Sequence, residues 1–238
     1  MLLETRRLSK SFGSLKAADG IDLAIAAGDA VGIIGPNGAG KSTLFNLITG
    51  SLEADAGQIL LQGVDITRFK AHRRCIAGIG RSYQIPHPFE NLTVFENLLV
   101  GAVHGRGRSV GDAVDVCAGI LDKTGLLQRA NAPAGSLTLL ERKRLEMARA
   151  LATSPKLLLL DEIAGGLTES ECHELVATIR SLRAGGITIV WIEHVVHALL
   201  AVVDRLIVLN FGRKIAEGAP HAVMSSAEVR EIYMGLAA

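Results

Sequence analysis

A glycine-rich segment between an apolar run and a helical pattern constrains this chain more than any other feature. Residues 35–43 read Gly-Pro-Asn-Gly-Ala-Gly-Lys-Ser-Thr; they follow the apolar run 31–34 and precede a helical pattern that ends near Gly50. Glycines let the backbone fold closely around an anion where a Cβ would obstruct it. The amides of such a loop and of the following helix N-terminus face that anion. The pattern GxxxxGK[ST] therefore predicts a Walker A loop that cradles the phosphates of a nucleoside triphosphate.

Each position of this loop is a candidate nucleotide contact. Lys41 is expected to bring a positive charge to the β and γ phosphates, and the Ser42 hydroxyl is a candidate Mg²⁺ ligand. A chance glycine-rich turn would not need a strand before it and a helix after it. The predicted nucleotide-binding residues are Gly35, Pro36, Asn37, Gly38, Ala39, Gly40, Lys41, Ser42 and Thr43.

Two adjacent carboxylates end a second apolar run. Asp161 and Glu162 follow Leu157–Leu160, as in a Walker B strand. At the carboxyl end of such a strand, Asp161 is predicted to bind the nucleotide and hold Mg²⁺, directly or through water. Glu162 is the candidate catalytic base that polarises the attacking water. The alternative is an ordinary exit from a strand into a loop, which the Walker A loop in the same chain makes less favourable.

A histidine ends a third apolar run. His194 follows Ile189–Ile192 and Glu193. At the carboxyl edge of a parallel sheet, its ring can hydrogen-bond a γ-phosphate and hold the water. A histidine satisfied within the core is the alternative. Because two other strand ends carry nucleotide chemistry, His194 is predicted to be a catalytic γ-phosphate sensor.

The apolar runs also predict the fold class. The runs Val31–Ile34, Leu157–Leu160, Ile187–Ile192 and Leu206–Leu209 read as strands covered on both faces. The sequence therefore predicts an α/β P-loop NTPase core with a mostly parallel sheet. The segments Leu2–Leu8, Ile21–Ile25 and Ile59–Leu61 alternate more and predict an N-terminal antiparallel layer. A helical subdomain over about 86–155, with a helix at Val110–Leu121, is expected as an insertion in a single domain spanning 1–238.

Composition excludes several other classes. In 238 residues, 49% are hydrophobic and the net charge is +1, so neither disorder nor nucleic-acid coating is expected. The three cysteines, Cys75, Cys117 and Cys172, have no metal-ligand spacing and read as thiols in a reducing cytosol. Charged residues interrupt the most apolar stretch, 187–211, so no membrane span is expected, and no signal peptide is visible.

With Lys41, Asp161, Glu162 and His194 in this order, the chain resembles the ATP-binding subunits of ABC transporters over nearly its whole length. The resemblance implies that ATP and Mg²⁺ are the ligands. It implies that Gln84 is the glutamine of the family's Q-loop, a catalytic residue that contacts Mg²⁺ or water and relays the state of the site to membrane subunits. Phe12 falls where the family places an aromatic side chain against adenine, and 165–168 falls at the loop that crosses between paired subunits.

Several stretches are similar to the branched-chain amino-acid importer group. They are 91–101, 144–151, 192–195 and 229–235. This resemblance implies an ATPase subunit that energises an importer for branched-chain amino acids or related small polar solutes. It also implies a second ATP-binding subunit, transmembrane permease subunits, and a cytoplasmic position on the inner face of the cell membrane. No nucleic acid partner is expected, and the fused cassettes or coiled-coil insertions of ABC ATPases acting on DNA or in translation are absent.

The family's signature motif, LSGGQ, is altered. Leu137–Glu141 reads Leu-Thr-Leu-Leu-Glu, which lacks both glycines. Thr138 keeps the hydroxyl that the family aims at the ATP of the opposing subunit, so it is a candidate nucleotide contact. Thr138 and Glu141 also form a capping-box pattern, which predicts that the helix survives and that the signature contact is weakened. The alternative function is a regulatory subunit with low turnover in an asymmetric heterodimer.

The remaining features are assigned no function. Ile163 stands where the family usually has proline, which predicts a more adjustable strand exit. The short basic clusters Arg6–Arg7, Arg73–Arg74 and Arg142–Arg144 are predicted to be solvated surface. His87, His104 and His221 are expected in loops without ligand partners.

Overall fold

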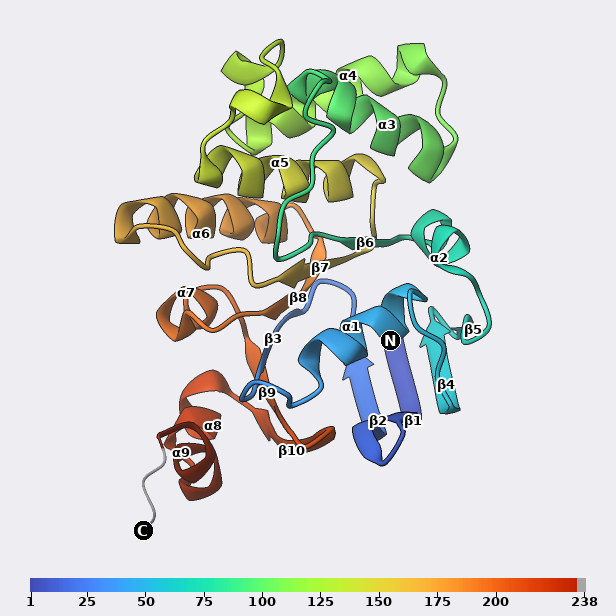
Figure 1. Ribbon diagram of the computed structural model, residues 1–238, viewed down its shortest axis with the longest axis vertical. Coiled ribbons are helices and arrows are strands. Elements are labelled where there is room, and N and C mark those ends of the chain that lie inside the picture. The colour runs from blue at the N-terminus through green and yellow to red at the C-terminus, as the bar shows by residue number, and fades with distance from the viewer. Residues whose placement is uncertain (235–238) are drawn as a thin grey trace.

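The computed structural model of the chain describes residues 1–234 (Figure 1). Residues 235–238 of the predicted domain lie outside the described residues. Two sheets lie at one end and in the middle of the long axis, and a group of helices lies at the other end.

The first sheet is antiparallel, with the strand order β2-β1-β4-β5. Leu3 in β1 pairs with Ile25 in β2 on one side and with Leu61 in β4 on the other. These three side chains are buried, which is the pattern of a sheet covered on one face only. The predicted N-terminal antiparallel layer is confirmed. Its strands are β1 (Leu3–Phe12), β2 (Leu15–Ile25), β4 (Ala56–Leu61) and β5 (Val64–Asp65).

The second sheet is mostly parallel, with the strand order β10-β9-β3-β8-β7-β6. Only β10 runs antiparallel, against β9. Every residue of β3, β7 and β8 is buried, because helices or the first sheet cover both faces. The four apolar runs are therefore confirmed as strands of a parallel sheet. The strands are β3 (Ala30–Ile34), β6 (Ile79–Arg81), β7 (Leu157–Asp161), β8 (Thr188–Ile192), β9 (Arg205–Asn210) and β10 (Arg213–Gly218).

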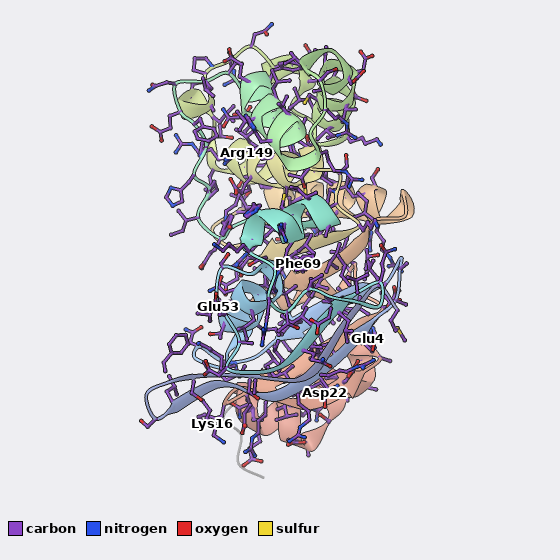
Figure 2. The ribbon with its side chains drawn as sticks, turned by 90° about the vertical axis from the view of Figure 1, so that its right-hand side faces the viewer. Glu4, Lys16, Asp22, Glu53, Phe69 and Arg149 are labelled. Carbon is purple, nitrogen blue, oxygen red and sulfur yellow. The ribbon has the colours of Figure 1, made fainter. Side chains whose placement is uncertain are left out.

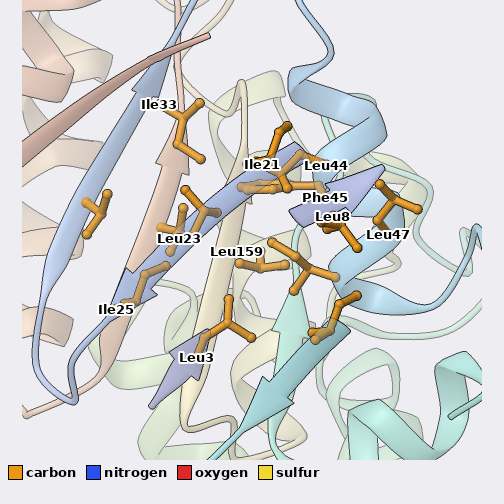
Figure 3. Close-up of a cluster of buried hydrophobic side chains, with 14 of the residues drawn as sticks. Leu3, Leu8, Ile21, Leu23, Ile25, Ile33, Leu44, Phe45, Leu47 and Leu159 are labelled. Atoms are coloured by element: carbon orange, nitrogen blue, oxygen red, sulfur yellow. The ribbon is translucent and has the colours of Figure 1, made fainter. Parts of the chain in front are cut away.

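Helix α1 (Lys41–Thr49) packs between the two sheets. Its Leu44 and Phe45 are completely buried against the inner face of the antiparallel sheet and one face of the parallel sheet (Figure 3). Burying such side chains contributes about 1.5–3 kcal/mol each. This core fixes the position of β3 and α1. The glycine-rich loop that joins them therefore lies at the carboxyl edge of the parallel sheet.

Helices on the other face of the parallel sheet complete the layers. Trp191 of β8 is completely buried there, beneath α5 (Leu139–Ala152), α6 (Glu169–Ala184) and α7 (Val196–Leu200). Two short helices, α8 (Pro220–Ser225) and α9 (Ala227–Met234), follow β10.

Between β6 and β7 the chain forms a group of helices at the far end of the molecule (Figure 1). Helices α3 (Val94–Arg106) and α4 (Val110–Lys123) pack on α5 through a separate core that includes Leu98, Leu121 and Leu145. Arg149 of α5 marks this end in Figure 2, whereas Lys16 and Asp22 lie on the antiparallel sheet at the opposite end. Helix α5 touches both cores and is therefore the mechanical link between the helices and the sheet.

One basic cluster departs from its predicted environment. Arg73 is exposed as expected, but Arg74 of α2 (Ala71–Ala77) is only 2% exposed. Its guanidinium donates to the carbonyls of Leu47 and Ile48 at the end of α1, at 2.5 and 3.0 Å. The prediction of a solvated Arg74 is wrong, because the open carbonyls at the end of α1 need donors and Arg74 supplies them.

Candidate functional site

The Walker A loop joins β3 to α1 and is shaped by two glycines that admit no side chain. A Cβ on Gly40 would lie 2.2 Å from the carbonyl oxygen of Ala17, and Gly40 has a φ of +98°. A Cβ on Gly35 would lie 2.3 Å from the carbonyl oxygen of Leu209. The loop is thus pressed against β2 and the end of β9. Its amides and the N-terminus of α1 form a cradle whose shape and polarity suit phosphate groups.

Lys41 begins α1 and turns back over the loop. Its Nζ donates to the carbonyls of Gly35 and Pro36 at 2.7 and 3.1 Å, and the residue is 6% exposed. Burial lowers the pKa of this amine, while the nearby carboxylates of Glu162 and Asp161 oppose that shift. The ammonium can exchange these two carbonyl partners for phosphate oxygens.

Several of the predicted nucleotide-binding residues line one pocket. Phe12 and Leu15, beside the β1–β2 turn, line it together with Glu162. Phe12 is 49% exposed and Lys10 Nζ lies 5.8 Å from its ring centroid, which leaves exposed ring surface for stacking on a base. Thr138 is not part of this lining. The loop residues in the lining are Asn37, Gly38, Ala39, Gly40, Lys41, Ser42 and Thr43.

Asp161 ends β7 in a buried ion pair. Arg81, at the end of the neighbouring strand β6, donates to its Oδ2 at 2.6 Å, and both side chains are less than a tenth exposed. The same guanidinium donates to Asn46 Oδ1 of α1 at 2.6 Å. Arg81 thus ties the end of β7 to the helix that follows the Walker A loop. No sequence pattern predicts this role for Arg81, although it stands three residues before Gln84.

Glu162 is the point where three predicted catalytic side chains meet. Its Oε2 accepts a hydrogen bond from Gln84 Nε2 at 2.6 Å, and its Oε1 lies 3.0 Å from His194 Nε2. Its backbone has a φ of +46°, unusual for a residue with a side chain, and its N–H donates to the carbonyl of Ile192 at 2.8 Å. Gln84 and His194, which lie 110 positions apart in the sequence, converge on one carboxylate at the carboxyl edge of the parallel sheet.

Behind this junction stands Glu193, which is 1% exposed. Its Oε2 accepts the N–H of Ala164 at 2.9 Å, and its Oε1 accepts the N–H groups of His194 and Val195 at 2.8 and 3.2 Å. One carboxylate therefore fixes the backbone after β7 and the backbone after β8. Its place directly before His194 was the only sequence signal for this function.

Lys143 of α5, like Arg74, is buried although its basic cluster predicts a solvated side chain. It was predicted to be solvated with its neighbours, but it is only 4% exposed. Its Nζ donates to the carbonyls of Gln84 and Glu162, at 2.7 and 3.3 Å. The helical spacing from the buried Leu140 and Met147 would have placed position 143 on the inner face. A charge on that face needs acceptors, and two distant loops provide them.

The altered signature segment begins α5 with the predicted capping box. The Thr138 side chain accepts the Glu141 N–H at 3.3 Å, and Glu141 Oε2 accepts the Thr138 N–H at 2.9 Å. Glu141 Oε1 also lies 3.2 Å from Arg129 Nε, so both carboxylate oxygens are engaged. The next residue after the cap, Leu139, is 44% exposed. The helix and its N-terminus thus persist without the glycines.

The exit after Glu162 is anchored, contrary to the expectation from the missing proline. Ile163 is completely buried in the core beneath α5 and α6, and Ala164 is held by Glu193. Packing and a buried hydrogen bond therefore restrain this segment in place of a fixed φ.

His87, His104 and His221 are exposed, but only His87 lies in a loop. The prediction of a loop is wrong for His104 and His221, because α3 and α8 extend over them.

The three cysteines are thiols, as predicted. Burial raises the pKa values of Cys75, Cys117 and Cys172, and all three are free thiols. Within residues 1–234, no cluster of histidine, cysteine, aspartate and glutamate side chains is arranged to hold a metal ion. In the same part of the chain, no helix combines the length and the apolarity that a membrane crossing requires.

Comparison with known families gives one match over most of the chain. The family model described as "ABC transporter" matches residues 18–165. This stretch holds the Walker A loop, Gln84, Thr138, Asp161 and Glu162.

Individual relatives match over nearly the full length. The high-affinity branched-chain amino acid transport ATP-binding protein BraF of Pseudomonas aeruginosa is 34% identical, and the match covers 98% of each chain. The probable branched-chain amino acid transport ATP-binding protein LivG of Methanocaldococcus jannaschii is 36% identical, with 98% of this chain and 97% of the relative covered.

Solved structures show the same fold. A nucleotide-free ATP-binding cassette from an ABC transporter has a TM-score of 0.90 and 36% identity, with 99% of both chains covered. An ATP-binding cassette of an ABC transporter in its ADP conformation has a TM-score of 0.90 and 35% identity over the same share of each chain. The predicted α/β cassette fold is confirmed.

Proposed function

Since this chain belongs to the ABC transporter ATP-binding proteins, we propose that it binds ATP in the pocket beside Phe12 and hydrolyses it at Glu162. The observation that carries the proposal is the convergence of Gln84 Nε2 and His194 Nε2 on the Glu162 carboxylate, next to the Walker A loop. The adenine ring stacks on Phe12, the phosphates lie in the cradle of residues 35–43, and the γ-phosphate points to the strand ends.

In this proposal each side chain around Glu162 has a separate task. Glu162 accepts a proton from the attacking water as the general base. His194 donates a hydrogen bond to the γ-phosphate and holds the water, and Gln84 orients the water from the other side. Lys41 exchanges its carbonyl partners for the β and γ phosphates and offsets their charge.

The residues present fit a Mg²⁺ ion. Ser42 is exposed at the start of α1, Asp161 ends β7 near Lys41, and Gln84 supplies a side-chain oxygen. Hydroxyl, carboxylate and amide oxygens are the ligands that Mg²⁺ takes. We propose Ser42, Gln84 and Asp161 as its ligands, direct or through water. When bound, the ion neutralises charge on the phosphate oxygens.

Replacement of Glu162 by Gln tests the catalytic assignment. The amide keeps the shape of the carboxylate but cannot accept the proton, so the turnover number is expected to fall by at least about 100-fold. The dissociation constant for Mg·ATP should change little. Retained turnover in Glu162→Gln would overturn the base assignment, and failure of the wild-type protein to bind ATP would overturn the proposal.

We further propose that the solute is a branched-chain amino acid or a related small polar solute, as the names of BraF and LivG indicate for those proteins. The test is uptake of leucine, isoleucine and valine by native cells whose only copy of the chain carries Glu162→Gln. Unchanged uptake of all three would contradict the proposed solute.

The working unit is proposed to be a pair of ATP-binding subunits. Thr138 lies outside the lining of the chain's own pocket, at an exposed helix N-terminus. In a pair, this end of α5 would face the ATP held by the other subunit. Size measurement of Glu162→Gln with and without Mg·ATP tests self-pairing. A nucleotide-dependent dimer supports a homodimer, whereas an ATP-binding monomer points either to a different ATP-binding subunit or to membrane partners that hold the pair together.

A permease subunit is proposed to dock near Gln84. Tyr83, Ile85 and Phe89 are exposed by 48%, 64% and 47%, an unusual density of large apolar side chains on one loop. This position would place the chain on the inner face of the cell membrane. The chain is then one nucleotide-binding domain over 1–238, with 86–155 as a helical subdomain that the docking loop leads into. Crosslinking from a cysteine at Ile85 to copurified membrane subunits tests this surface.

A further inference from the structure

We propose that Lys143 is a positioning residue for ATP hydrolysis, which locks the backbone of Gln84 to the backbone of Glu162 from inside α5. The inference rests on the proposed function, because its effect on turnover requires that Glu162 be the base. Lys143 is a buried cation that does not line the nucleotide pocket, and this inference gives it a function.

The contacts form a closed ring of three residues. Lys143 Nζ donates to the Gln84 carbonyl at 2.7 Å and to the Glu162 carbonyl at 3.3 Å. The side chains of Gln84 and Glu162 close the ring with a bond of 2.6 Å. Each loop is thus held at its backbone by the same ammonium. The separation of the amide and the carboxylate therefore depends on where α5 holds Lys143.

Two further residues of α5 hold the same loop one and two turns later. The backbone N–H groups of Tyr83 and His87 lie near enough to the buried Glu146 carboxylate, 6% exposed, to oppose the rise in its pKa. Arg149 Nη1 donates to the His87 carbonyl at 2.9 Å and to Glu146 Oε2 at 2.9 Å. Residues three apart lie on one helix face, so these side chains clamp the loop over its length. These contacts tie the loop to α5, and of the three side chains Lys143 is the one that also bonds to Glu162.

The charge of Lys143 matters as well as its donors. The carboxylates of Glu193, Glu162 and Asp161 all lie near enough to stabilise its ammonium, although burial acts against the charge. Removing the ammonium would leave the strand-end carboxylates with less compensation. A neutral side chain at 143 is expected to disturb the Gln84–Glu162 bond even where it fits the space.

The experiment compares Lys143→Met with the wild-type protein. Methionine keeps most of the volume and removes both donors and the charge. The turnover number is expected to fall by about 100-fold, because small displacements of catalytic groups cost that much. The dissociation constant for Mg·ATP should stay within about threefold, since no Walker A contact is lost. Lys143→Arg keeps the charge and the donors and is expected to recover part of the turnover.

Hydrogen exchange supplies a readout that needs no activity. In the nucleotide-free protein, exchange of the amides in residues 82–87 should be faster in Lys143→Met than in the wild type. The matched control is Lys123→Met, because Lys123 is an exposed lysine at the end of α4. The control should leave turnover and exchange unchanged. If Lys143→Met does not fold, Lys143→Gln takes its place in every comparison.

The outcomes separate the two proposals. A turnover number within about twofold of wild type, or no recovery by Lys143→Arg, overturns the positioning role. Equal losses of nucleotide affinity and turnover also overturn it, because they indicate a general structural defect. If the wild-type protein binds ATP but does not hydrolyse it, the proposed function is wrong. The positioning role of Lys143 in hydrolysis is then wrong as well. Exchange in residues 82–87 then still decides whether Lys143 holds the loop.

Discussion

The side chain of Glu193 and the backbone of Ala164 join the ends of two neighbouring parallel strands. Glu193 Oε2 accepts the Ala164 N–H at 2.9 Å in an almost fully buried position. The other oxygen of the same carboxylate holds the backbone of His194. The segment that carries Glu162 and the segment that carries His194 are therefore positioned by one acceptor. The buried Glu193 carboxylate therefore fixes the separation between Glu162 and His194 from the side that is away from solvent.

Replacement of Glu193 by Ala should destabilise the protein and slow hydrolysis. Three backbone donors lose their acceptor, and a buried donor without a partner costs about 1–3 kcal/mol. We expect a loss of about 2–5 kcal/mol in the free energy of unfolding in urea. Glu193→Gln keeps one acceptor oxygen and should lose less. An Ala variant within about 0.5 kcal/mol of wild type would contradict the assignment of these hydrogen bonds.

The Arg81–Asp161 pair should be costly to break from one side. Arg81→Met leaves the Asp161 carboxylate buried without its cation, which typically costs about 3–5 kcal/mol. Adding Asp161→Asn to Arg81→Met removes the uncompensated charge and should recover part of that loss. The free energy of unfolding of both single variants and the double variant measures the coupling. Additive losses would show that the two side chains do not interact.

Two glycines of the Walker A loop should differ in their tolerance of a methyl group. Gly38 has a φ of +81° but open space around its Cβ position, so Gly38→Ala should cost about 1–2 kcal/mol through backbone strain alone. In Gly40→Ala the methyl group would meet the Ala17 carbonyl at 2.2 Å, so the loop must move. We expect Gly40→Ala to lose the binding of Mg·ATP. Its melting temperature should also be lower than that of Gly38→Ala. Equal melting temperatures and affinities would contradict this geometry.

The buried carboxyl of Glu146 should make stability depend on pH. Burial raises its pKa above the usual value of 4.5, although Arg149 and two backbone N–H groups oppose the shift. The folded state then holds the proton more tightly than the unfolded state. Its contribution to stability therefore falls as pH rises from 4.5 through the folded-state pKa.

Glu146→Gln removes this titration and should flatten that part of the profile. Melting temperatures of wild type and Glu146→Gln from pH 4.5 to 8 provide the measurement. The stability of the Gln variant relative to wild type should increase with pH. Glu174→Gln, at an exposed carboxyl on α6, is the control. Parallel profiles for Glu146→Gln and wild type would show that the raised pKa is wrong.

Local patterns were enough to predict much of the fold. The glycine-rich loop, the four apolar runs and the capping box at Thr138 each depend on residues within a few positions of one another. Backbone preferences and side-chain periodicity act over the same range. The resemblance to a family added the candidate roles of Phe12 and Gln84, which no local pattern indicates.

The tertiary structure alone decided which charges are buried and what they hold. Lys143 bonds to a carbonyl 59 positions away, and Arg81 pairs with a carboxylate 80 positions away. Arg74 likewise reaches the end of α1, 27 positions earlier. A short basic cluster reads as solvated because its own neighbours offer no acceptor. The acceptors come from segments that the sheet order brings together, so burial of these cations is a property of the assembled chain.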